Sequence, residues 1–167
     1  FGDVNRNGRY DPAADVTAPA GVAVQVFRSG WPLPIATTTT NAAGRYVFRD
    51  LGGGDYYVVI PGTEFGPGGL LEDWALQPLG FEADPNTDQN ESVDHHGSGV
   101  LPLSALGGVR TGVATLSATV PASPLQQPTG DEPLGDNVAG LTLPVGDDFT
   151  NLTLDIGLIP PALPAVS

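Results

Sequence analysis

Apolar residues recur at every second position in several short stretches, and this pattern predicts β-strands. Val22, Val24 and Val26 lie on one face of the first such stretch. Four threonines follow at residues 37–40, and residues 56–60 form a dense run of tyrosine, valine and isoleucine, which favour extended structure. The N-terminal third of the chain therefore predicts a small antiparallel meander or half of a Greek key.

Turn-forming residues separate these strands. Residues 41–44 read Asn-Ala-Ala-Gly, in which asparagine begins a turn and glycine supplies a positive φ. The chain of 167 residues holds 23 Gly and 17 Pro, a density that disfavours long helices and favours short strands joined by many turns.

The second half of the chain is less regular. Residues 64–110 show no clear period, although residues 70–76 are compatible with one or two helical turns. Alternation returns at residues 113–120 and is clearest near the end of the chain, where one face of a strand carries Leu152, Leu154, Ile156 and Leu158. Strands at this spacing predict an all-β, antiparallel β-sandwich.

Charge and composition narrow the function classes. The chain carries 14 Asp and 5 Glu against six Arg and no Lys, which gives a net charge of −13. Such a surface repels the phosphates of nucleic acids and anionic membranes, so neither is an expected partner, and it favours cations. The absence of Cys excludes disulfides and thiolate chemistry, and no apolar run is long enough to span a bilayer.

Oxygen-bearing side chains recur on alternate residues in the segment 3–11, which contains an Asp-x-Asn-x-Asn-Gly run. Alternate positions of a tight loop converge on one point, and the glycine permits the sharp turn that a calcium loop needs. The twelfth position, where an acid normally closes the shell, is Ala14, so either Asp15 in a bulged loop or a distant carboxylate must complete it. The expected calcium ligands are Asp3, Asn5, Asn7, the backbone carbonyl of Arg9, Asp11 and Asp15. An Asx-rich turn that binds nothing is the alternative.

A second acidic loop covers residues 84–94 and again places Asp or Asn on alternate positions. It lacks a glycine at the sixth position, so it is not a regular EF-type loop, and a solvated run of charge is the alternative. The candidate calcium ligands here are Asp84, Asn86, Asp88, Asn90 and Asp94, with Glu91 as another candidate to complete the shell.

These segments together resemble a known family, the SdrD B-like repeat. The resemblance rests on residues 1–11 (FGDVNRNGRYD), 21–24 (GVAV), 38–48 (TTTNAAGRYVF), Leu51, 55–59 (DYYVV) and 151–158 (NLTLDIGL). Such repeats are calcium-binding, Cna-B-type modules of bacterial surface proteins. The resemblance implies an antiparallel Greek-key β-sandwich, Ig-like or Cna-B-like, with long calcium-binding loops. We expect one such domain over residues 1–160, with an irregular insertion around residues 64–130, and an extended tail at residues 161–167.

The missing lysine bears on how such a module is reinforced. The resemblance suggests a Lys–Asn or Lys–Asp isopeptide bond, which many Cna-B-type domains contain, but this chain has no Lys and cannot form one. Crowded carboxylates repel one another by ~1 kcal/mol per pair even in water, and a divalent cation reverses that term. We therefore expect calcium to supply the reinforcement.

The leading hypothesis is a non-enzymatic structural module, extracellular, on a bacterial cell surface or in a secreted fibre. The family's first strand is missing or short before Phe1, which would leave an unpaired sheet edge. The apolar tail, residues 162–167, would then cross into another copy and assemble the chain head-to-tail by strand addition. The alternative is that the short first strand only reflects where this sequence was cut.

Two other functions compete with this hypothesis. An adhesin or carbohydrate-binding module would use calcium and an exposed Trp31 or Trp74, although tryptophan more often packs in a core or at its rim. A hydrolase would need His95 or His96 beside Ser92 or Ser98, but no G-x-S-x-G motif is present, and two adjacent histidines do not make a closed zinc site.

Overall fold

The computed structural model describes residues 1–8, 11, 13–48, 51–79, 81, 96–105, 107–116, 137–138, 141–142 and 156–161. Over these residues the chain forms short strands, one 3-10 helix, η1 (Gly62–Phe65), and no α-helix. Residues 70–73 form turns and β4 begins directly after Trp74, so the helical turns predicted over residues 70–76 are replaced by turns and a strand. None of the helical structure in the described residues is long and apolar enough to cross a membrane.

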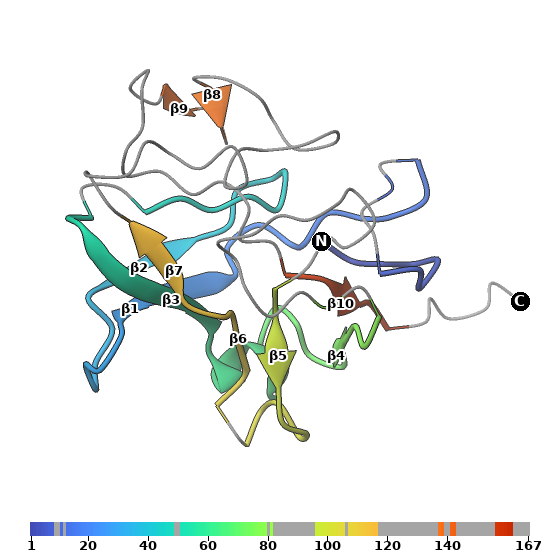
Figure 1. Ribbon diagram of the computed structural model, residues 1–167. Coiled ribbons are helices and arrows are strands. Elements are labelled where there is room, and N and C mark those ends of the chain that lie inside the picture. Colours follow the sequence, from blue (N-terminus) through green and yellow to red (C-terminus); the bar gives the residue numbers. More distant parts are fainter. Residues whose placement is uncertain are drawn as a thin grey trace, which may run out of the picture.

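The main sheet has six strands, all paired antiparallel (Figure 1). Its strand order is β2-β1-β3-β6-β5, and β7 also pairs with β3. The bounds are β1 (Ala23–Arg28), β2 (Ala36–Thr39), β3 (Gly54–Ile60), β5 (Ser98–Gly99), β6 (Val109–Arg110) and β7 (Ala114–Leu116).

Two smaller antiparallel sheets accompany the main one. The first joins β4 (Ala75–Leu76) to β10 (Leu158–Ile159), and the second is the hairpin of β8 (Asn137–Val138) and β9 (Leu141–Thr142). The N-terminal segment extends the first of these, because Gly2 bridges both Val16 and Leu158. Figure 1 accordingly shows the N-terminus beside β10.

The order of the first three strands decides between the two predicted topologies. β3 pairs with β1 rather than with β2, so Val26 lies between Ala36 on one side and Val58 on the other. A meander would place β3 beside β2, and it is excluded. The chain instead crosses back to lie beside its first strand, which is the kind of return that a Greek key makes with its fourth strand.

The predicted turn between β2 and β3 is confirmed. The side-chain Oδ1 of Asn41 accepts the backbone N–H of Ala43 (2.9 Å) and that of Arg45 (3.0 Å). Gly44 has a φ of 70°, and an added Cβ would lie 2.8 Å from the backbone nitrogen of Ala18, so both conformation and space require glycine. Local chemistry therefore sets this reversal of the chain.

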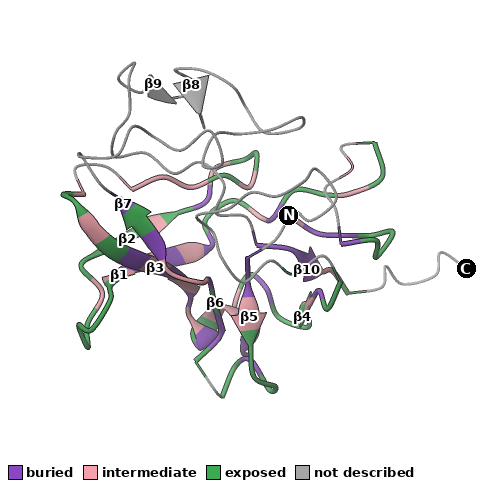
Figure 2. Cartoon of the chain, viewed as in Figure 1, coloured by how far each residue is buried: buried purple, intermediate pink, exposed green. Residues whose placement is uncertain are grey.

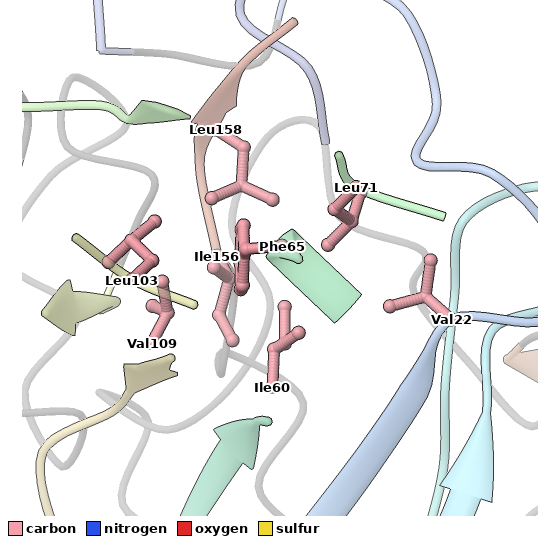
Figure 3. Close-up of a cluster of buried hydrophobic side chains, with 8 residues drawn as sticks. All are labelled: Val22, Ile60, Phe65, Leu71, Leu103, Val109, Ile156 and Leu158. Atoms are coloured by element: carbon pink, nitrogen blue, oxygen red, sulfur yellow. The ribbon is translucent and has the colours of Figure 1, made fainter. Parts of the chain in front are cut away.

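The core consists of two buried clusters on one face of the main sheet, and one of them also packs against the β4–β10 layer. The period of two on β1 and β3 buries one face of each strand, as the sequence predicts. At one end of that face the buried cluster consists of Val24, Val26, Tyr56, Val58 and Leu116. At the other end side chains from both layers converge (Figure 3): Val22, Ile60, Phe65, Leu71, Leu103, Val109, Ile156 and Leu158. Because one apolar cluster joins the two layers, the predicted all-β, antiparallel sandwich is confirmed.

Replacing Leu158 tests this closure. Its side chain is 1% exposed and joins the cluster from the small sheet, so Leu158→Ala should lower the free energy of unfolding by about 2–5 kcal/mol. Leu33→Ala is the matched control, since Leu33 is 72% exposed and its truncation should cost less than about 0.5 kcal/mol. Leu33 belongs to the loop between β1 and β2, most of which Figure 2 colours as exposed. Urea unfolding measures both, and equal losses would show that β10 does not close the core.

Candidate metal centre

The carboxylate of Asp3 organises the first acidic loop. Asp3 has no exposed surface, and both of its oxygens accept hydrogen bonds from the protein. Oδ1 accepts the backbone N–H groups of Arg6 and Asn7, while Oδ2 accepts the backbone N–H of Gly8 (2.7 Å) and the side-chain amide of Gln77. Gly8 has a φ of 81°, which is the sharp turn predicted for this position. The loop is therefore wound around one buried anion.

Three side chains of this loop converge at its surface. The Nδ2 atoms of Asn5 and Asn7 donate to the same oxygen of Asp11, Oδ2, at 2.8 and 2.7 Å. A half-turn of an asparagine amide exchanges its nitrogen for its oxygen at nearly the same position. With a cation at that point the three side chains could direct oxygen atoms toward it, as a hard cation such as Ca²⁺ requires, although Asn5 would then give up the N–H of Asn7 that its Oδ1 accepts at 3.0 Å.

Asp15 closes the loop through the backbone. Its Oδ1 accepts the N–H of Val4 (2.9 Å) and its Oδ2 accepts the N–H of Asp11 (2.8 Å). The backbone N–H of Asp15 also donates to the carbonyl oxygen of Asp11 at 2.8 Å. Asp15 therefore holds the beginning and the end of the loop together, and each carboxylate oxygen keeps lone-pair capacity beyond these bonds.

The loop is anchored to segments that are distant in the sequence. The backbone N–H of Asp3 donates to the carbonyl of Leu158 at 2.7 Å, and Gln77, which directly follows β4, is 1% exposed where it reaches Asp3. Sequence reasoning missed Gln77, because it lies 74 positions from Asp3 and belongs to no motif. The only sequence signal for Gln77 was that this polar residue directly follows the apolar residues of β4.

Several predicted site residues lie outside the described residues. They are Arg9 of the first loop and all candidates of the second, namely Asp84, Asn86, Asp88, Asn90 and Asp94, together with Glu91. Within the described residues, no group of three or more His, Cys, Asp or Glu side chains is gathered for a metal. A cation in the first loop would therefore depend on amide and carbonyl oxygens as well as on carboxylates.

The residues that the two competing functions would use differ in exposure, and only some of them are among the described residues. Trp31 is 56% exposed, with the guanidinium of Arg28 6.0 Å from its ring centre, whereas Trp74 is half-buried and packs against the core cluster. A stacking platform for a sugar therefore has Trp31 as its candidate. The hydroxyl of Ser98 donates to the carbonyl of Arg110 at 3.2 Å and His96 is buried, while Ser92 and His95 lie outside the described residues.

A family profile and one curated protein match this chain. The sequence profile of the SdrD B-like domain matches residues 1–95, more than half of the chain. Colossin-A of Dictyostelium discoideum is 44% identical over 57 residues, which cover 34% of this chain and, to the nearest percent, 0% of Colossin-A. The chain thus spans a very small part of that relative's length. No solved structure matches the chain.

Removing the buried carboxylate tests how the loop is held. Asp3→Ala takes away the acceptor of four N–H groups, and a buried donor without a partner costs about 1–3 kcal/mol. We expect a loss of about 2 kcal/mol or more in the free energy of unfolding, measured with EGTA present so that calcium does not contribute. Asp55→Ala is the control, because Asp55 is exposed, accepts a hydrogen bond from the Thr115 hydroxyl and should cost less than about 1 kcal/mol. Equal losses would contradict the anchoring role of Asp3.

Proposed function

The chain belongs to the SdrD B-like domain family, and from this premise we propose that it is a calcium-stabilised structural module of an extracellular protein. The family is a structural, non-catalytic type of domain that occurs in surface proteins. One observation carries the calcium part of the proposal: Asn5 and Asn7 converge on a single oxygen of Asp11, in a loop wound around the buried Asp3.

The donor set of the loop favours calcium over other cations. Carboxylate, amide and backbone carbonyl oxygens are hard ligands, and calcium accepts six to eight of them in a flexible arrangement. Zinc and copper prefer His and Cys, and the chain has no Cys. Magnesium demands a stricter octahedron and keeps several of its waters, which suits a mixed loop of this kind less well. The residues that would hold the ion are Asp3, Asn5, Asn7, the carbonyl of Arg9, Asp11 and Asp15.

A bound ion would neutralise charge in the loop. The hydrogen bonds of Asp3 and Asp15 would then make the segments they join more rigid. Three aspartates, Asp3, Asp11 and Asp15, belong to the first loop, and a divalent cation held there would offset their negative charge. Asp3 fixes the loop to Leu158 and Asp15 fixes its two ends to each other. Because a chain without Lys cannot form a Lys–Asn cross-link, the ion takes the reinforcing role in this proposal.

Calcium should raise the thermal stability of the full chain. An ion that binds only the folded state adds about 4 kcal/mol at 1,000 times its Kd, which for a chain of this size raises Tm by about 8–16 °C. Differential scanning calorimetry with calcium and with EGTA measures the shift, which the combined change Asn5→Ala, Asn7→Ala and Asp11→Ala should greatly reduce.

The matched control for this shift is Asn41→Ala. Asn41 also organises a turn through its side-chain oxygen, but it lies between β2 and β3 and not in the acidic loop. This variant should melt at a lower temperature yet keep the full calcium-dependent rise. If the unaltered protein melts at the same temperature with calcium and with EGTA, the calcium proposal is wrong.

The remaining parts of the proposal rest on the sequence. The second acidic loop, residues 84–94, is proposed as another calcium site on its alternating Asp and Asn residues. A location on a bacterial surface or in a secreted fibre rests on the family resemblance alone. Colossin-A does not support the bacterial part of this location, because it comes from Dictyostelium discoideum. A carbohydrate-binding role remains the second candidate, and the exposure of Trp31 is the observation that favours it.

Head-to-tail assembly with other copies of the chain is also part of the proposal. β2 ends the main sheet, and Thr37 and Thr39 on it are exposed, so this edge offers backbone groups to an added strand. The proposed donor is the apolar tail, residues 162–167, which lies outside the described residues.

Deleting residues 160–167 tests this assembly. The deletion should abolish polymers and leave a folded monomer, because the residues that fill the two core clusters remain. Sedimentation velocity over a range of concentrations, with circular dichroism as the check of folding, measures both properties. Polymers that persist after the deletion would show that another surface joins the copies.

A further inference from the structure

Gln77 connects the acidic loop to the small sheet of the sandwich. Its side chain is 1% exposed, its Nε2 donates to Oδ2 of Asp3, and its Oε1 accepts the backbone N–H of Leu79 at 2.9 Å. Both ends of the amide are therefore in use. A reversed amide would place an oxygen against the carboxylate of Asp3 and lose both bonds, so the orientation of Gln77 is fixed.

Backbone hydrogen bonds also join the segments that carry Gln77 and Asp3. The N–H of Gln77 donates to the carbonyl of Gly157 (3.4 Å), and the N–H of Asp3 donates to the carbonyl of the next residue, Leu158 (2.7 Å). The N–H of Leu158 in turn donates to the carbonyl of Phe1 at 3.0 Å. The start of the chain, the end of β4 and the start of β10 thus meet at one buried carboxylate.

We propose that Gln77 is a positioning residue for the ion, because it orients Asp3. Through the same contact, binding of calcium in the acidic loop would favour packing of the β4–β10 layer against the main sheet. The inference rests on the proposed calcium function. A carboxylate held by a directed N–H keeps its orientation, and outer partners of this kind change metal affinity about 10–100-fold when they are removed. Such coupling is reciprocal. If the hydrogen bond from Gln77 to Asp3 strengthens calcium binding, bound calcium strengthens that hydrogen bond and stabilises the β4–β10 layer by the same free energy.

The first test compares calcium affinities by titration calorimetry on the full chain. Gln77→Met keeps the length of the side chain but cannot donate to Asp3, and it should raise the calcium Kd about 10–100-fold. Thr111→Val is the matched control, since Thr111 is a buried polar residue directly after β6 whose hydroxyl accepts the N–H of Val58 at 3.0 Å. This control should melt at a lower temperature and keep the calcium Kd unchanged.

The second test needs no variant, so it holds even if Gln77→Met does not fold. Hydrogen exchange followed by NMR reports the N–H of Gly8, which binds Asp3 within the loop, and the N–H of Leu158, which binds Phe1 in the small layer. Calcium should slow exchange at both sites. Slowing at Gly8 alone would overturn the coupling.

The outcomes separate the two proposals. If the unaltered protein binds calcium and Gln77→Met binds it with the same Kd, the role of Gln77 is wrong and the calcium function stands. If Gln77→Met and Thr111→Val weaken binding equally, the effect is a general loss of stability and the role of Gln77 is again wrong. If the unaltered protein binds no calcium, the proposed function fails and the role of Gln77 fails with it.

Discussion

The burial of one carboxylate is the constraint on which the rest of this structure depends. Transferring a charge out of water costs several kcal/mol unless other groups compensate for it. Asp3 has no exposed surface, and three backbone N–H groups of its own loop and the amide of Gln77 supply that compensation. Each donor fixes a part of the chain, so the loop, the N-terminal segment and the end of β4 are placed by the same requirement.

This requirement matters because the small layer is weak by itself. β4 and β10 are two residues long each, and an isolated pair of strands is marginal in water. The layer gains stability from the apolar cluster that joins it to the main sheet and from the hydrogen bonds around Asp3. In the function we propose, the ion strengthens the second of these contributions. The acidic loop would then regulate how firmly the sandwich is closed.

Local chemistry made a large part of the fold predictable. The valines at 22, 24 and 26 are all buried, and the Asn41 turn forms as expected, because strand period and turn chemistry act over a few residues. The helical turns expected over residues 70–76 were wrong, since the pairing of Leu76 with Leu158 places a strand there. That pairing joins residues far apart in the chain, which a local pattern does not report.

The sequence by itself determined the fold class and the family, since both follow from local strand patterns and motifs. It also determined the winding of the first loop, because the Asp-x-Asn-x-Asn-Gly run fixes Asp3 and the turn at Gly8 through short-range hydrogen bonds. Only the tertiary structure decided that β3 returns beside β1, and that Gln77 completes the compensation of Asp3. Both depend on contacts between residues brought together by burial of the core. Such contacts are selected by the packing of the whole domain and leave no periodic trace in the chain.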